Sequence, residues 1–230
     1  MSTQPPPSPQ RSAQETRTAL LEAAAAEILE SGYAAASLSS IAARQGLTKG
    51  ALAHQFPAKG DFVGAFGDAL RDAVRQSAMT AREAFPDSPT RALIAFLLHL
   101  GARATREPAV AAATALFSDR AVPGPRLTTA VTELLEETER FVADAQRAGE
   151  ADSRLPAGDI AEHVLITNLG TASFRLHTHA TAPGRPRLRF LRITLTGSGF
   201  HDVDDVIDGV VASRANGTLD ELPPSKTLTR

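Results

Sequence analysis

The chain has 230 residues, 43% of them hydrophobic, with a formal net charge of −2 and no cysteine. The length suits one or two small domains with a proper core, and the missing cysteines exclude disulfide frameworks, cysteine nucleophiles and thiolate zinc sites. The net charge argues against a basic surface over the whole protein. Residues 31–60, however, hold Arg44, Lys49 and Lys59 with no Asp or Glu. This local basic patch is compatible with phosphate contacts, which act within roughly one Debye length.

The chain starts with the Pro-rich stretch MSTQPPPSPQ. It has too little apolar surface to fold, so we expect residues 1–13 to form a disordered arm. Arg11 and Arg17 leave open the alternative that the arm binds a DNA groove. The stretch lacks the apolar core of a signal peptide, and no apolar run reaches the roughly 18 residues of a membrane span. We therefore expect a cytoplasmic protein with no membrane partner.

Residues 14–31 predict a helix, because they are rich in the helix formers Ala, Leu and Glu. The apolar residues of one face are Leu21, Ala24, Ala25 and Ile28. Gly32 is expected to end this helix as a C-cap, and Tyr33 to close a small helical core.

Two short helices joined by a glycine turn are predicted in the stretch SLSSIAARQGLTKGALAHQF, residues 37–56. The first opens at Ser37, and its apolar residues fall at positions i, i+3 and i+4. Gly46 interrupts this spacing, and Thr48 is the expected N-cap of the second helix. Two short helices with a tight turn between them form a helix-turn-helix.

The second short helix presents small and cationic residues outward. These are Lys49, Gly50, Ala53 and His54. Small residues allow close approach to DNA, and cations suit its phosphates. The spacing of Leu52 and Phe56 turns both inward.

Leu20 to Phe66 resembles the DNA-binding domain of the TetR family of bacterial transcriptional regulators. The family pattern is a long first helix ending in G-Y, then S-[LV]-x-x-I-A-x-x-x-G-[LV]-[ST]-K-G-[AT]-L-Y-x-H-F-x-[SN]-K. The matching residues are Gly32, Tyr33, Ser37, Leu38, Ile41, Ala42, Gly46 to Leu52, Phe56 and Lys59. The chain departs at Ala53, where the family usually has Tyr, and at Gln55, where it usually has His. That Tyr normally contacts the DNA backbone or a thymine methyl, so the resemblance implies weak or unusual operator affinity.

A fourth helix is predicted from about residue 57 to about residue 85, with Pro57 near its start and Pro86 beyond its end. Gly60 and Gly67 are unusual inside a helix and are expected to loosen its first turns. This helix would connect the helix-turn-helix to everything that follows, which makes it the expected lever between the two domains.

The rest of the chain is predicted to be helical, because no strand alternation appears between its apolar runs. The predicted helices span residues 89–105, 108–118, 127–149, 159–181, 187–196 and 202–215. We expect an all-α fold with an N-terminal three-helix, helix-turn-helix domain at residues 14–60. A C-terminal helical domain for ligand binding and dimerisation follows at residues 61–215, and a flexible tail at residues 216–230.

The helix that starts near Asp159 is predicted to form a homodimer. Its residues Gly170, Thr171, Ala172 and Ser173 are small, which allows close packing against a symmetry mate. In the TetR family the last long helices form a four-helix bundle between protomers, and this helix resembles them in position. An internal core helix is the alternative.

The second half also resembles the γ-butyrolactone autoregulator receptors and their pseudo-receptor relatives. The similar features are Gly149, Leu155 with Pro156, the helix around Asn168 to Gly170, and a basic segment at residues 185–192. Those receptors cover their lactone with a tryptophan, and this chain has no tryptophan. The resemblance therefore implies a pseudo-receptor or a different ligand.

An apolar effector pocket is predicted in the second half, because one phenylalanine recurs in each long helix with polar side chains nearby. The candidate residues are Phe96, His99, Phe117, Phe141, Asn168, Thr171 and Phe174. A plain core is the alternative, with His99 as a hydrogen-bonded core histidine.

No convergent catalytic set is found, so we expect neither an enzyme nor a cofactor. His177 and His179 are two residues apart and face different sides of a helix, so no metal site is expected. Gly197, Ser198 and Gly199 lack the flanking strand and the G-x-S-x-G spacing of a nucleophile elbow.

Taken together, the sequence predicts a homodimeric repressor that a small-molecule effector releases from a palindromic double-stranded DNA operator. Thr48, Lys49 and Gly50 would approach bases and backbone, and Ser37, His54 and Lys59 would approach phosphates. Ala53 is also a predicted DNA-binding position. The alternative is a TetR-fold dimerisation or ligand-sequestering protein whose DNA binding is weak or absent.

Overall fold

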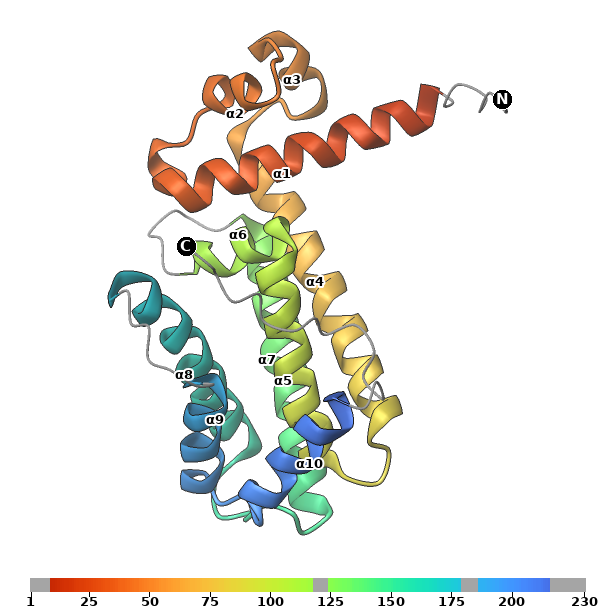
Figure 1. The fold of residues 1–230 in the computed structure, drawn as a ribbon, viewed down its shortest axis with the longest axis vertical. Coiled ribbons are helices and arrows are strands. Elements are labelled where there is room, and N and C mark those ends of the chain that lie inside the picture. The colour runs from red at the N-terminus through yellow and green to blue at the C-terminus, as the bar shows by residue number, and fades with distance from the viewer. Residues whose placement is uncertain (1–8, 118–123, 179–185, 216–230) are drawn as a thin grey trace. The chain divides into compact units, whose positions relative to one another are not determined.

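A computed structural model of the protein describes residues 9–117, 124–178 and 186–215. Within these ranges the chain forms ten helices (Figure 1). A single isolated β-bridge joins Ala151 and Phe200 in the described part of the chain. The predicted all-α fold is therefore confirmed for the described part of the chain. The first helix already starts at Pro9, inside the stretch predicted to be a disordered arm. Residues 1–8 and the tail at 216–230 lie outside the described residues.

The helix boundaries follow the proline and glycine positions closely. In chain order the helices are α1 (Pro9–Ala35), α2 (Leu38–Arg44), α3 (Lys49–Gln55), α4 (Lys59–Ala84), α5 (Pro89–Arg106), α6 (Pro108–Leu116), α7 (Pro125–Arg147), α8 (Ala157–Thr178), α9 (Pro186–Gly197) and α10 (Val203–Ala215). Several of them begin at a proline, where the missing amide costs little. No described helix is both long enough and apolar enough to span a membrane.

The chain divides into two units. The first comprises residues 1–70 and 106–129, and the second residues 71–105 and 130–230. In the first unit, α2 and α3 pack against each other and α2 packs on α1, while α6 also packs on α1 (Figure 1). The first unit therefore contains more of the chain than the predicted domain at residues 14–60.

Aromatic rings connect α3 to α4 in the core of the first unit. The Phe56 and Phe62 ring centroids lie 4.0 Å apart, and those of Phe62 and Phe66 lie 6.5 Å apart. All three side chains are almost completely buried. Since Phe56 follows α3 directly, this stack fixes the end of α3 on the first turns of α4.

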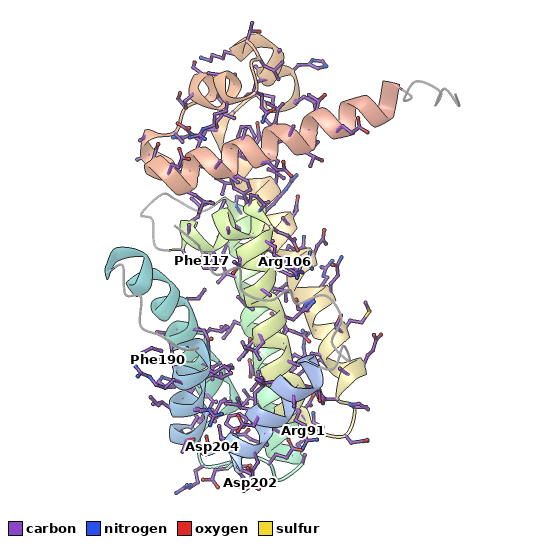
Figure 2. All side chains as sticks on the ribbon, in the orientation of Figure 1. Arg91, Arg106, Phe117, Phe190, Asp202 and Asp204 are labelled. Carbon is purple, nitrogen blue, oxygen red and sulfur yellow. The ribbon has the colours of Figure 1, made fainter. Side chains whose placement is uncertain are left out.

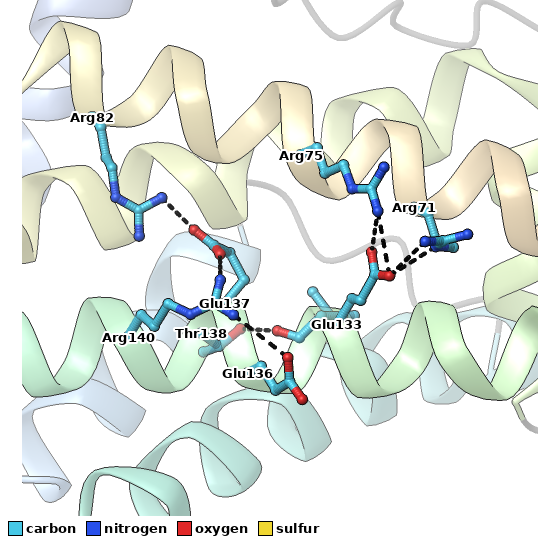
Figure 3. A network of polar contacts seen from close by, with 9 residues as sticks. Arg71, Arg75, Arg82, Glu133, Glu136, Glu137, Thr138 and Arg140 are labelled. Atoms are coloured by element: carbon cyan, nitrogen blue, oxygen red, sulfur yellow. Dashed lines mark hydrogen bonds and ion pairs between the residues drawn. The ribbon is translucent and has the colours of Figure 1, made fainter.

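In the second unit, α4, α5 and α7 share an apolar core with ion pairs beside it. Phe96 of α5 stacks on Phe141 of α7 at a centroid distance of 5.2 Å. Arg71 donates to Glu133 across α4 and α7 at 2.9 Å, and Arg82 pairs with Glu137 further along (Figure 3). These contacts hold the two long helices together within this unit.

The last three helices also lie in the second unit. α8 packs against α9, and α9 against α10 (Figure 1). Arg192 of α9 pairs with Asp204 and Asp208 of α10, each at 2.5 Å. Asp202 lies in the turn between these helices and has a positive φ of 48°. The two arginine contacts fix α10 on α9.

Candidate nucleic-acid interface

The first helix of the predicted pair begins as its sequence predicts. The Ser37 hydroxyl accepts a hydrogen bond from the Ser40 amide at 3.0 Å, and the Ser40 hydroxyl accepts one from the Ser37 amide at 3.0 Å. This reciprocal pair is a capping box, which satisfies two amides that a helix leaves without partners. Ile41 and Ala42 are buried, so α2 is held on its apolar face.

The turn and the second helix also match the prediction. Gly46 has a φ of +64°, a backbone conformation that residues with a Cβ atom rarely adopt. The Thr48 hydroxyl then accepts a hydrogen bond from the Ala51 amide at 3.2 Å and caps α3. The structure therefore contains two short helices joined by a glycine turn at residues 37–56.

The outward face of α3 carries the predicted DNA-contacting residues. Leu52 is fully buried and anchors the helix. Thr48, Lys49, Gly50 and His54 are exposed, and Ala53 is half-buried. Ser37 is exposed at the start of α2. Among the described residues, neither Lys49 nor His54 has an ion-pair partner, so both remain available to an anionic partner.

Arg17 of α1 supports the other end of α3. Its guanidinium donates to the Gln55 carbonyl at 3.3 Å and lies 4.3 Å from the centre of the Phe56 ring. A cation at a helix C-terminus interacts favourably with the helix dipole. The sequence suggests Arg17 only as part of a DNA-binding arm, and no local pattern marks a contact 38 residues along the chain.

Arg44 is turned toward α1. Its guanidinium donates to Glu27 of α1 at 2.5 Å and also pairs with Glu30. Hydrogen bonds from Arg44 and Ser40 hold the pKa of Glu27 below its ordinary value of 4.5. This cation of the predicted basic patch therefore fixes α2 on α1.

Lys59 is engaged within the protein. Its Nζ donates to the Tyr33 carbonyl at 2.7 Å and to the Ala36 carbonyl at 2.9 Å, and it lies 4.3 Å from the centre of the Tyr33 ring. Tyr33 is itself half-buried, and this burial raises the pKa of its phenol. Tyr33 therefore lies under Lys59. Phe56, which the sequence predicts to point inward, is buried in the core.

Several predicted pocket residues are part of the core or bonded locally. Phe96 and Phe141 are almost fully buried in their stack, and the Arg82 guanidinium lies 4.1 Å from the centre of the Phe141 ring. His99 Nδ1 lies 2.8 Å from the hydroxyl of the buried Ser77. The side-chain Nδ2 of Asn168 donates to the Val164 backbone carbonyl, one turn earlier, at 2.9 Å. These contacts match the alternative of a plain core.

The remaining pocket candidates lie in the other unit or have side chains that the structure does not describe. Phe117 lies at the C-terminal end of α6 and belongs to the first unit (Figure 2). Thr171 and Phe174 are in α8, but their side chains lie outside the described residues, as does His179. The effector pocket therefore stays a prediction.

A cavity of about 210 Å³ lies in the first unit. It is lined by Thr16, Ala19, Leu20, Gln45 and Leu47. Sites for drug-sized ligands usually exceed about 300 Å³, so this cavity is too small for a typical effector site. In the described ranges, no group of three or more His, Asp or Glu side chains could hold a metal ion.

A comparison with known protein families gives independent evidence on the helix-turn-helix. Residues 20–66 match the profile of bacterial regulatory proteins of the tetR family. The matched residues include most of α1, both short helices and the first turns of α4. No curated protein matches the chain in sequence.

Solved structures share the fold over most of the chain. SmeT, the repressor of the Stenotrophomonas maltophilia multidrug efflux pump SmeDEF, is 20% identical, with a TM-score of 0.65 over 81% of this chain and 92% of that chain. A gamma-butyrolactone receptor, an ArpA-like protein, is 23% identical, with a TM-score of 0.66 over 89% and 99%. CprB, a TetR family protein from S. coelicolor A3(2), is 24% identical, with a TM-score of 0.65 over 90% and 99%. At these identities the likeness shows a shared fold.

Proposed function

Residues 20–66 belong to the TetR family of bacterial regulatory proteins, and from this premise we propose that the chain is a ligand-responsive, DNA-binding repressor that acts as a homodimer. The family is one of regulators and not of enzymes. The observation that carries the proposal is α3, a short helix capped by Thr48 and anchored by Leu52, which exposes Lys49, Gly50 and His54. A short exposed helix of this kind fits the major groove.

The homodimer would form through α8 and α9. Ile166 of α8 and Ile193 of α9 are each 61% exposed, which is unusual for large apolar side chains. A Cβ atom added at Gly170 or Gly197 would meet nothing within 4 Å, so this face has room for a partner helix. Two such helix pairs would pack as a four-helix bundle around a twofold axis.

The operator would then be approximately palindromic. In a twofold dimer, the two copies of α3 enter successive major grooves about one helical turn apart. Thr48, Lys49, Gly50 and Ala53 would approach bases and backbone, and Ser37 and His54 would approach phosphates.

The effector would bind in the domain at residues 61–215. SmeT has been solved in complex with triclosan, and a gamma-butyrolactone receptor shares the fold, which supports a small apolar effector. The chain has no tryptophan, which favours a pseudo-receptor or a ligand other than a butyrolactone. The effector must bind better to the conformation whose α3 spacing does not fit DNA, because equal affinity for both conformations shifts nothing. α4, which contributes residues to both units, is the proposed lever.

A second candidate is a dimerising or ligand-sequestering protein that no longer binds DNA. It is supported by the engagement of two cations of the basic patch within the protein, since Arg44 binds Glu27 and Lys59 binds backbone carbonyls. Ala53 supports it too, because it replaces the usual tyrosine of the family.

An electrophoretic shift assay on DNA from upstream of the protein's own gene separates the two candidates. The repressor should shift one fragment, bind more weakly as salt rises, and need a higher protein concentration for the same shift when it carries Lys49→Ala. Glu22→Ala, on the exposed side of α1, is a matched control that should bind as wild type does. If wild type shifts no promoter fragment at low salt, the second candidate is correct.

A further inference from the structure

We propose that Lys59 is a positioning residue of the DNA-binding head (residues 14–66), whose ammonium holds the C-terminal end of α1 on the first turn of α4 and does not contact DNA. This inference rests on the proposed function, because it concerns how the same DNA-binding surface is built. Lys59 matches the lysine at the end of the family pattern, and the proposal gives this lysine a structural role in this chain.

The ammonium group is already bound by the protein backbone. It carries three N–H donors, and three carbonyls surround it, those of Tyr33 at 2.7 Å, Ala36 at 2.9 Å and Ala34 at 3.4 Å. The face of the Tyr33 ring lies 4.3 Å away and attracts the cation further. The side chain is only partly exposed.

These carbonyls need a partner because of where α1 ends. Gly32 leaves the helical conformation, with φ 78° and ψ 158°, so the carbonyls after it are not all paired in a continuing helix. The C-terminal end of a helix also carries partial negative charge, which a lysine neutralises. Lys59 therefore acts as a C-cap supplied from a distant part of the chain.

The position of Lys59 links this cap to the DNA-reading helix. Ala36, whose carbonyl it binds, directly precedes Ser37, the N-cap of α2. Three residues after Lys59, Phe62 stacks on Phe56 at the end of α3 with a centroid distance of 4.0 Å. The first turn of α4 thus holds both the start of α2 and the end of α3, so removal of the Lys59 ammonium should tilt α3.

Lysine labelling of the wild-type protein tests this directly. The chain has only three lysines, Lys49, Lys59 and Lys226, so each labelled peptide can be assigned by mass spectrometry. With an amine-acylating reagent, Lys49 should react in the free protein and be protected by operator DNA. Lys59 should react slowly with and without DNA. Fast labelling of free Lys59 that operator DNA suppresses would overturn the proposal.

Two methionine variants give a second, energetic test. Lys49→Met should leave the Tm unchanged and reduce the magnitude of the salt slope of binding by about 0.9 for each phosphate that the variant no longer neutralises, about 1.8 for a dimer. Lys59→Met should lower the Tm by several degrees and weaken binding while the salt slope stays at the wild-type value. A reduced slope with an unchanged Tm for Lys59→Met would show that Lys59 binds a phosphate.

The folded state of the variant needs its own control. If Lys59→Met does not fold, Lys59→Gln keeps two N–H donors for the carbonyls and should recover part of the Tm, again with a wild-type salt slope. Failure of the proposed function looks different. In that case wild type binds no DNA, yet the slow labelling of Lys59 and the lowered Tm of its variants would still be observed.

Discussion

A Cβ atom added to Gly67 would lie only 2.7 Å from the backbone nitrogen of Leu127. The carbonyl carbon and oxygen of Arg126 would lie at 2.8 and 2.9 Å. The start of α7 therefore crosses α4 at Gly67. Only glycine, which lacks a Cβ atom, leaves room there for the α7 backbone. The sequence predicts that Gly67 loosens the helix, whereas the structure shows that it permits close packing.

Gly67→Ala should lower the free energy of unfolding by about 1 to 3 kcal/mol, because the added methyl group forces the two backbones apart. Alanine is by itself the better helix former by about 1 kcal/mol, so the direction of the change identifies the cause. Urea unfolding of the purified protein measures it.

Gly60→Ala is the matched control within the same helix. A Cβ there would meet nothing within 4 Å, so the substitution should leave stability unchanged or raise it by up to about 1 kcal/mol. Equal stabilities of the two alanine variants would refute the close crossing at Gly67.

Acid should weaken the contact between α4 and α7 through Glu133. Hydrogen bonding and charge from Arg71, with Arg75 adding to both, hold the pKa of this carboxyl below its ordinary value of 4.5 (Figure 3). A carboxyl with a lowered pKa in the folded state stabilises the protein above its ordinary pKa and loses that effect as the pH falls below it. The pair should therefore contribute at pH 7 and fail progressively below about pH 4.5.

Glu133→Gln should cost up to about 1 kcal/mol at pH 7, since the pair is partly exposed, and should reduce the fall in Tm between pH 7 and pH 3. Glu136→Gln is the control, because Glu136 pairs with Arg140 at 3.5 Å on an exposed surface. A Tm profile for Glu133→Gln that is as steep as that of wild type would show that the pair does not contribute.

The sequence predicts those features that depend on neighbouring residues. The helix start at Ser37, the turn at Gly46 and the cap at Thr48 each involve residues within three or four positions, and all three are confirmed. The roles of Arg44 and Lys59 depend on partners 14 to 26 residues away. Sequence periodicity does not reveal such distant pairs. From the charge of their side chains alone, both residues are therefore assigned to a basic patch.

Restoring the family tyrosine should strengthen DNA binding. Ala53 is half-buried on α3, beside the exposed His54, and a tyrosine there could reach the DNA backbone or a thymine methyl. Ala53→Tyr should lower the Kd for the native operator several-fold, and Ala53→Phe, which lacks the hydroxyl, should recover less. If neither substitution improves binding, position 53 does not limit affinity.

A charge placed on the proposed dimer face should separate the protomers. Ile193→Asp buries an unpaired carboxylate in the four-helix bundle, which is strongly unfavourable. Sedimentation velocity at micromolar concentration should show a monomer, with no operator shift. Met79→Asp adds the same charge on α4 at a side chain that is 57% exposed and should remain dimeric. A dimeric Ile193→Asp protein would place the interface elsewhere.

The most direct test of the account is capture of genomic DNA by the purified protein, with Lys49→Ala as the paired sample. Fragmented DNA from the source organism is bound at moderate salt, and the retained fragments are sequenced. The account predicts a few strongly enriched sites that share an approximate palindrome, with half-site centres about one helical turn apart, and no such enrichment with the variant. Wild-type protein that retains no sequence above the input, or the same sequences as Lys49→Ala, would contradict it.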